Sequence, residues 1–106
     1  MKDVDARTER LTDFNAAIAS RTLGMVGTVT WKVDGFEQNG VVVCPPDFSP
    51  ERKYPRVLNI HGGPMGTSAE SFGGRGGVLN HSRAARGWIG FLPNYRGSNN
   101  MGQAFQ

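Results

Sequence analysis

The stretch Arg56–Pro64, RVLNIHGGP, decides the fold. Its apolar first half has the composition of a strand, because leucine and β-branched residues precede a cluster of residues that break regular structure. Two glycines followed by a proline neither continue a strand nor start a helix, so the loop leaves backbone N–H groups free to face a ligand or an oxyanion. A strand that ends in such a loop is typical of the position at which an α/β fold places its chemistry.

A β-hairpin is predicted upstream of this strand. The segment Thr28–Val33 alternates polar and apolar residues, and the segment Phe36–Cys44, which ends in an apolar run, follows it. The dipeptide Asp34-Gly35 between them is a two-residue turn signal. A competing turn signal, Asn39-Gly40, divides the chain into less equal runs, so we interpret it as a bulge or bend inside the second strand.

A helix and a further strand are predicted downstream. The segment Val78–Arg86, VLNHSRAAR, favours a helix, and Gly87 is placed to end it at the C′ position. The apolar segment Trp88–Leu92 follows as a strand. We expect this strand and Arg56–Ile60 to be buried on both faces, which predicts a parallel pair joined by a right-handed crossover. The fold class is therefore α/β: a β-hairpin, then a parallel strand–helix–strand unit.

The first 24 residues differ from the remainder. Residues 1–10 are polar, and a short helix is predicted from Phe14 to Ala19, with Thr12 or Asp13 as its N-cap. Gly24 ends this segment. We therefore divide the chain into an N-terminal polar segment with a short helix, residues 1–24, and the α/β unit, residues 25–106.

Composition limits the class of protein. The chain has 106 residues, of which 38% are hydrophobic and 20% charged, which indicates one small ordered domain. The net charge is +3, but the basic residues are scattered, so we expect no nucleic-acid partner. The sequence contains neither the apolar core of a signal peptide nor a run long enough to span a bilayer. We therefore expect a cytoplasmic protein without a membrane partner.

Several kinds of site are excluded by residue type and spacing. The single cysteine, Cys44, excludes an internal disulfide and a cysteine-cluster zinc site, and its place in an apolar run indicates a packed strand residue. The two histidines lie far apart with no carboxylate at ligand spacing, so we expect no metal, and we place His81 on the surface or between helices. The segment Gly73–Gly77 matches neither a phosphate loop nor a dinucleotide fingerprint. It indicates a flexible loop, and no cofactor is expected.

Two loops that follow neighbouring parallel strands are candidates for one site. The loops His61–Pro64 and Asn94–Ser98 are expected at the same edge of the sheet. The backbone N–H groups of Gly62 and Gly63 could stabilise a negative oxygen. Arg96 could pair with a carboxylate or organise its loop. By spacing alone, a pair of tight turns without a ligand stays an equal alternative.

A nucleophile is not evident. No Gly-x-Ser-x-Gly occurs in the sequence, and none of the candidate serines lies on a predicted strand-to-helix turn. These serines are Ser68, Ser71, Ser82 and Ser98. His61 could act as a general base, but its neighbours supply no nucleophile, so a hydrogen-bonded structural histidine is favoured. We assign no catalytic residue.

Taken in order, these motifs resemble the peptidase S9 family, the prolyl oligopeptidase, dipeptidyl peptidase and acylaminoacyl peptidase group of serine peptidases. The resemblance lies in HGGP after an apolar strand, a helix ending in AARG and a strand ending in NYRGS. The segments Lys53–Pro55 and Leu11–Asn15 agree with it, and it covers residues 11–106. After Ser98 the family usually continues with glycine, an aromatic residue and glycine, whereas this chain has Asn100–Gly102.

The resemblance implies the N-terminal part of an α/β-hydrolase catalytic domain, which would follow a β-propeller and would end before the nucleophile elbow. It implies that His61, Gly62 and Gly63 belong to the oxyanion hole or to substrate binding. The parent would cleave peptide or acyl-peptide bonds with a Ser, Asp and His triad beyond Gln106, and this chain alone would be inactive. Peptide would be the parent's substrate, and an uncovered sheet edge would favour self-association. The alternatives are an esterase- or lipase-type hydrolase fragment, in which glycine more often stands where this chain has Pro64, and a non-catalytic interaction remnant.

Overall fold

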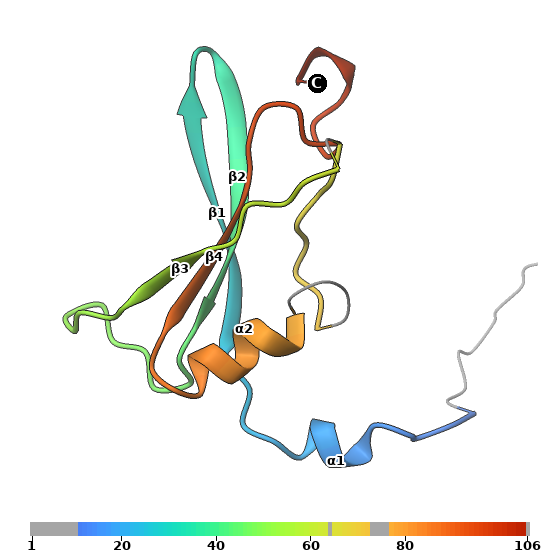
Figure 1. Ribbon diagram of the computed structural model, residues 1–106, viewed down its shortest axis with the longest axis vertical. Helices are drawn as coiled ribbons and strands as arrows, with labels where there is room; N and C mark the ends of the chain where they lie inside the picture. The colour runs from blue at the N-terminus through green and yellow to red at the C-terminus, as the bar shows by residue number, and fades with distance from the viewer. Residues whose placement is uncertain (1–10, 64, 73–76, 106) are drawn as a thin grey trace, which may run out of the picture.

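A four-stranded mixed sheet with strand order β1-β2-β4-β3 forms the centre of the computed structural model (Figure 1). The structure describes residues 11–63, 65–72 and 77–105. The elements are α1 Ala16–Ala19, β1 Met25–Val33, β2 Phe36–Cys44, β3 Arg56–Leu58, α2 Gly77–Ala84, β4 Ile89–Asn94 and the short 3₁₀ helix η1 Gln103–Phe105.

The hairpin of β1 and β2 is confirmed. Asp34 and Gly35 have φ angles of 52° and 81°, and a two-residue turn with both φ angles positive matches the twist of the strands that it joins. The strands pair antiparallel from Val33↔Phe36 to Met25↔Cys44. The first strand begins at Met25, ahead of the predicted Thr28, because Cys44 at the end of β2 supplies it with a partner.

The bulge predicted at Asn39-Gly40 is wrong. Asn39 pairs with Thr30 and Gly40 with Val29, so the register continues through this dipeptide without an inserted residue. The glycine serves packing instead. A Cβ atom at Gly40 would lie 2.7 Å from Cε2 of Phe91 on β4, so only glycine leaves room for that ring.

The parallel pair and its helical crossover are confirmed. Strand β3 pairs parallel with β4 from Arg56↔Ile89 to Leu58↔Phe91, and α2 lies between them in the chain. The last hydrogen bond of the ladder runs from Asn59 N–H to the Phe91 carbonyl at 2.8 Å. The next bond would have to run from the nitrogen of Pro93 to the Asn59 carbonyl. Proline has none, so the chain leaves the sheet after Asn59 and turns into the His61 loop.

The core is small and lies between the sheet and α2. Val41, Val43 and Ala84 are buried together, and Leu92 packs against them. On the opposite face, Trp31 and Phe91 meet edge to face with ring centroids 5.8 Å apart. Burial of β3 on both faces is a wrong prediction, because β3 is an edge strand: Leu58 is 57% exposed, and Ile60 just beyond the strand is 67% exposed.

The predicted stop at Gly87 is confirmed, although α2 itself ends at Ala84 and not at the predicted Arg86. Gly87 has a φ of 81°, its N–H donates to the Ala84 carbonyl, and Trp88 N–H donates to the Arg83 carbonyl. This pair of bonds is a Schellman motif with glycine at C′. His81, predicted on the surface or between helices, is instead buried on α2 with its ring 5.2 Å from that of Phe72. The loop predicted over Gly73–Gly77 lies outside the described residues, except for Gly77, which opens α2.

The predicted N-terminal helix is present but shorter than expected, and its N-cap is different. Asn15 precedes α1, and its side chain makes no capping bond; neither Thr12 nor Asp13 occupies the cap. The helix starts where the alanines begin, since alanine favours helix most. In Figure 1, α1 lies apart from the sheet, and the division of the chain at residue 24 stays a prediction.

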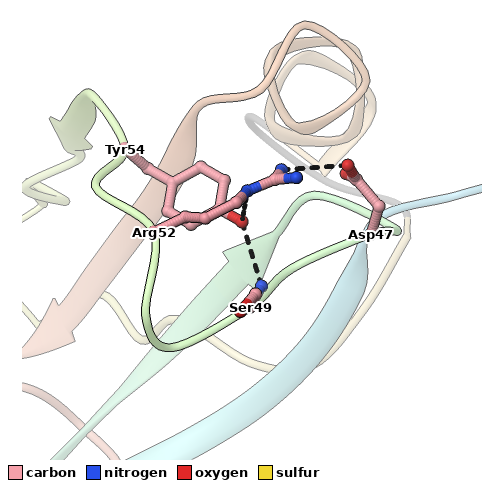
Figure 2. Close-up of polar contacts among 4 residues, drawn as sticks. All are labelled: Asp47, Ser49, Arg52 and Tyr54. Atoms are coloured by element: carbon pink, nitrogen blue, oxygen red, sulfur yellow. Dashed lines mark hydrogen bonds and ion pairs between the residues drawn. The ribbon is translucent and has the colours of Figure 1, made fainter.

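The loop between β2 and β3 is held by its own side chains (Figure 2). The Tyr54 phenol oxygen accepts hydrogen bonds from Ser49 N–H and from Arg52 Nε, each at 2.9 Å. Arg52 also pairs with Asp47 at 2.9 Å. The hydrogen bond from Arg52 holds the pKa of the Asp47 carboxyl below its ordinary value. This network fixes the chain just ahead of β3.

Candidate functional site

The two predicted loops meet through the side chains of His61 and Ser98. The His61 Nε2 and Ser98 Oγ atoms lie 2.9 Å apart, within hydrogen-bond distance. Ser98 is 0% exposed, so its hydroxyl is enclosed by the protein. The carboxyl ends of β3 and β4 position these residues, since parallel neighbours release their loops at the same edge of a sheet. The predicted meeting of the two loops is confirmed.

Tyr95 makes the second connection between the loops. Its ring stacks on the His61 imidazole with centroids 4.7 Å apart and planes 17° apart. Its hydroxyl donates a hydrogen bond to the His61 backbone carbonyl. A third connection joins the Asn99 N–H to the Gly66 carbonyl at 3.3 Å. The His61 loop is therefore fixed to the end of β4 through both its side chain and its backbone.

The turn Tyr95–Ser98 presents these groups. Ser98 N–H donates to the Tyr95 carbonyl at 2.9 Å, and Gly97 has a φ of 98°. A positive φ at the third residue is the mark of a type II turn, which glycine fills without strain. The turn brings the Tyr95 ring onto a face of the His61 imidazole and the Ser98 hydroxyl to its Nε2 atom.

The backbone of Gly62 and Gly63 forms the part of the loop that directly follows His61. Both are exposed, and neither N–H has an acceptor among the described residues. Gly63 has a φ of 124°, a conformation that favours glycine. A Cβ atom at Gly62 would meet nothing within 4 Å, so the space where a side chain would stand is open. The loop therefore offers unpaired backbone donors to a ligand.

The loop folds back on itself at Gly66. A Cβ atom there would lie 2.6 Å from the Gly62 carbonyl oxygen and 2.8 Å from His61 Nδ1. Glycine at this position allows the return of the chain to lie against the imidazole. His61 Nδ1 is buried and has no hydrogen-bond partner among the described residues. Because the Ser98 hydroxyl is enclosed as well, the contact between His61 and Ser98 positions the loop. This agrees with the predicted role of His61 as a hydrogen-bonded structural histidine.

Arg96 organises its own loop. Its guanidinium lies over the Phe36 ring at 4.2 Å from the centroid, a cation–π contact. The Phe36 ring in turn meets Phe105 at 6.3 Å, and the Phe105 carbonyl accepts the Gly97 N–H at 2.9 Å. Arg96 was predicted either to pair with a carboxylate or to organise its loop. Among the described residues it organises the loop, because the Phe36 ring under its guanidinium meets Phe105 of η1.

Sequence reasoning missed three of the residues that build this site. Tyr95 and Gly66 were not singled out, and Asn94 was only the start of a loop. Asn94 is buried and donates to Asn39 Oδ1 at 2.7 Å and to the Ser68 carbonyl at 2.9 Å. It also accepts the Ser68 N–H at 2.7 Å, so it ties the segment after the His61 loop to the sheet. The signal was the run NYRGS, which concentrates polar side chains at a strand end.

A cavity of about 490 Å³ lies behind the loop, between α2 and the sheet. Its polar lining includes Asn59, Ser68, Asn80 and His81. Asn59 Nδ2 donates to Asn80 Oδ1 at 2.7 Å, which links the end of β3 to α2.

The remaining features support no second site among the described residues. No group of three His, Cys, Asp or Glu side chains gathers closely enough in them to hold a metal ion. Cys44 is a half-buried strand residue, as predicted, and burial raises the pKa of its thiol. In the same part of the chain, no helix combines the length and the apolar character needed to cross a membrane.

Comparison with curated proteins identifies related peptidases. The chain is 32% identical over 97 residues to dipeptidyl-peptidase 5 of Porphyromonas gingivalis, a match that covers 90% of this chain and 14% of that protein. It is 36% identical over 63 residues to dipeptidyl-peptidase 5 of Aspergillus fumigatus, covering 59% of this chain and 8% of that protein. The chain thus spans a small part of each relative. No family model matches it.

Solved structures give the same relationship. Acylaminoacyl peptidase of Pyrococcus horikoshii superposes with a TM-score of 0.75 and 26% identity, over 92% of this chain and 15% of that one. Dipeptidyl peptidase 4 of Porphyromonas gingivalis shares the fold, with a TM-score of 0.64 over 86% of this chain and 13% of that one, at 20% identity. The likeness in sequence and in fold thus extends over about nine-tenths of the chain, and the chain belongs to the peptidase S9 family.

Proposed function

We propose that residues 25–106 form the N-terminal part of an α/β-hydrolase catalytic domain and carry the oxyanion-hole loop of a serine peptidase. The observation that carries the proposal is the exposed, unpaired backbone of Gly62 and Gly63, held in place by Tyr95 and Ser98. Donors held rigid before the reaction stabilise the developing negative oxygen without reorganisation. The names of the relatives support peptide or acyl-peptide bonds as the substrate class.

The nucleophile has to come from outside residues 1–106. The sequence holds no Gly-x-Ser-x-Gly, and Ser98, the serine in contact with a histidine, is fully enclosed. An oxyanion loop without nucleophile and base retains little catalysis. We therefore expect that a serine-directed fluorophosphonate does not label this polypeptide, and stoichiometric labelling of any serine in it would overturn this part of the proposal.

A chimera tests the function itself. The segment of Porphyromonas gingivalis dipeptidyl-peptidase 5 that aligns with this chain is replaced by this chain, and hydrolysis of a peptide anilide and of a matched ester is measured. Retained peptide hydrolysis supports the proposal. Loss of peptide hydrolysis with retained ester hydrolysis would favour an esterase-type fragment.

Two substitutions at one position isolate the oxyanion donor in the chimera. Gly62→Pro removes the N–H, whereas Gly62→Ala keeps it, and a Cβ at this position meets nothing within 4 Å. Gly62 is not among the residues with positive φ, so neither substitution is excluded by a left-handed backbone. The proposal predicts that only the proline variant loses activity.

A further inference from the structure

We propose that Tyr95 is a positioning residue that sets the direction of the Gly62 N–H; this inference rests on the oxyanion role proposed above. The Tyr95 hydroxyl donates to the His61 carbonyl in a partly buried position. Its effect on a ligand would therefore pass through the peptide that joins His61 to Gly62.

The geometry of that peptide transmits the effect. The His61 carbonyl and the Gly62 N–H belong to one planar unit, and no cis peptide occurs among the described residues. In a trans peptide the carbonyl and the N–H point in opposite directions. A hydroxyl that holds the carbonyl thereby holds the N–H in the opposite direction, in which no described residue accepts it.

Without Tyr95 this peptide has few restraints. Gly62 carries no side chain, and the space around its absent Cβ is empty to 4 Å, so no side-chain contact of Gly62 opposes rotation of the peptide. The His61 ring is held separately, by Ser98 at 2.9 Å and by stacking at 4.7 Å. The ring contacts fix the side chain, and the Tyr95 hydroxyl fixes the peptide plane. A bond to the carbonyl also polarises the amide, which strengthens its N–H as a donor.

The chain provides a matched control for a test. It has two tyrosines, and each hydroxyl is hydrogen-bonded: Tyr95 to the His61 carbonyl, and Tyr54 to Ser49 and Arg52 in the loop before β3. Tyr95→Phe and Tyr54→Phe each remove one oxygen and keep the ring. Ser98→Ala releases the His61 ring and leaves the carbonyl bond in place.

The readout is the direction of the Gly62 N–H in this chain, measured by its residual dipolar coupling in partially aligned solution. The His61 carbonyl ¹³C shift reports the hydrogen bond. We expect Tyr95→Phe to change the Gly62 N–H coupling and the His61 carbonyl shift. We expect Tyr54→Phe to change neither quantity. Ser98→Ala should shift the His61 ring nitrogens while the Gly62 coupling stays at its wild-type value. An unchanged Gly62 coupling in Tyr95→Phe would overturn the inference.

Should Tyr95→Phe fail to fold, 3-fluorotyrosine at both tyrosines replaces it, because this phenol ionises at lower pH and cannot donate once ionised. The Gly62 amide resonance should then shift with ionisation of the Tyr95 phenol; no shift would overturn the inference.

In the chimera, Tyr95→Phe should lower kcat about tenfold at nearly constant KM, as expected for one lost hydrogen bond. If Gly62→Pro inactivates the chimera but Tyr95→Phe leaves kcat unchanged, the inference about Tyr95 is overturned. If Gly62→Pro itself leaves the chimera active, the oxyanion proposal fails instead.

Discussion

The hydroxyl of Tyr95 donates to the backbone carbonyl of His61 while the two rings stack with centroids 4.7 Å apart. One residue at the end of β4 thus contacts both the backbone and the side chain of the residue that opens the glycine loop. This relationship joins the carboxyl ends of the parallel strands into one structure. It holds the peptide between His61 and Gly62 at the edge of the sheet.

Ser98→Ala should destabilise the chain by about 1–2 kcal/mol, because it removes the partner of His61 Nε2 at 2.9 Å from the enclosed position of Ser98. Urea unfolding followed by tryptophan fluorescence measures the free energy of unfolding. Ser82→Ala is the matched control: this hydroxyl is exposed and bonds the Val78 carbonyl within α2, so its loss should stay within about 0.5 kcal/mol. Equal effects of the two substitutions would contradict the enclosed role of Ser98.

Gly97→Ala should cost about 1 kcal/mol or more, since Gly97 has a φ of 98° and alanine is strained there. Gly27→Ala is the control, because Gly27 lies in β1 without a positive φ and with nothing within 4 Å of a Cβ. Replacing glycine in a strand interior should be neutral or stabilising. Thermal unfolding distinguishes the two, and a Gly97→Ala variant as stable as Gly27→Ala would refute the turn assignment.

The Asp47–Arg52 pair predicts a pH dependence at acid pH. The hydrogen bond from Arg52 lowers the pKa of Asp47 in the folded chain below its ordinary value of 3.8. The contribution of a carboxyl with a lowered folded pKa is present above 3.8 and is lost as pH falls through the folded value. Asp47→Asn should therefore reduce the loss of stability on acidification in this window. In an Arg52→Gln background the same substitution should have no such effect; a persistent effect would assign the pH dependence to another partner.

Strand β3 should mediate self-association, because no described strand pairs with its outer edge and Leu58 is 57% exposed. Sedimentation velocity should show a sedimentation coefficient that rises with protein concentration. Leu58→Lys should suppress the rise, whereas Val78→Lys, on α2 and 58% exposed, should not. A wild-type chain that stays monomeric at high concentration would contradict this expectation.

Much of the fold could be predicted from local sequence. The Asp34-Gly35 turn and the Gly87 helix end depend on residues within a few positions, and local chemistry specifies them. Gly40 was misinterpreted because its cause is Phe91 on another strand, which no local pattern reveals. The exposure of β3 is likewise set by the neighbours of the sheet and not by the apolar run itself.

The site, like the fold, could be predicted where local sequence specifies it and not where distant residues do. The glycine loop and its meeting with the NYRGS loop could be predicted, because parallel strands deliver their loops to one edge. The contacts that hold the two loops together could not be predicted, because Tyr95 and His61 are 34 positions apart and their pairing depends on ring orientation. The sequence presents Ser98 as the end of a site loop and as a candidate nucleophile, whereas its enclosure assigns it to the support of His61.

The central claim is that the Gly62 N–H is a donor to the oxyanion of a peptidase reaction. The most direct measurement is the ratio of kcat for Gly62→Pro and Gly62→Ala in the chimera with dipeptidyl-peptidase 5. Loss of one oxyanion donor lowers kcat about 10²- to 10³-fold, so we predict a ratio of about that size, with Gly62→Ala near the unsubstituted chimera. Equal kcat values for the two variants would contradict the claim.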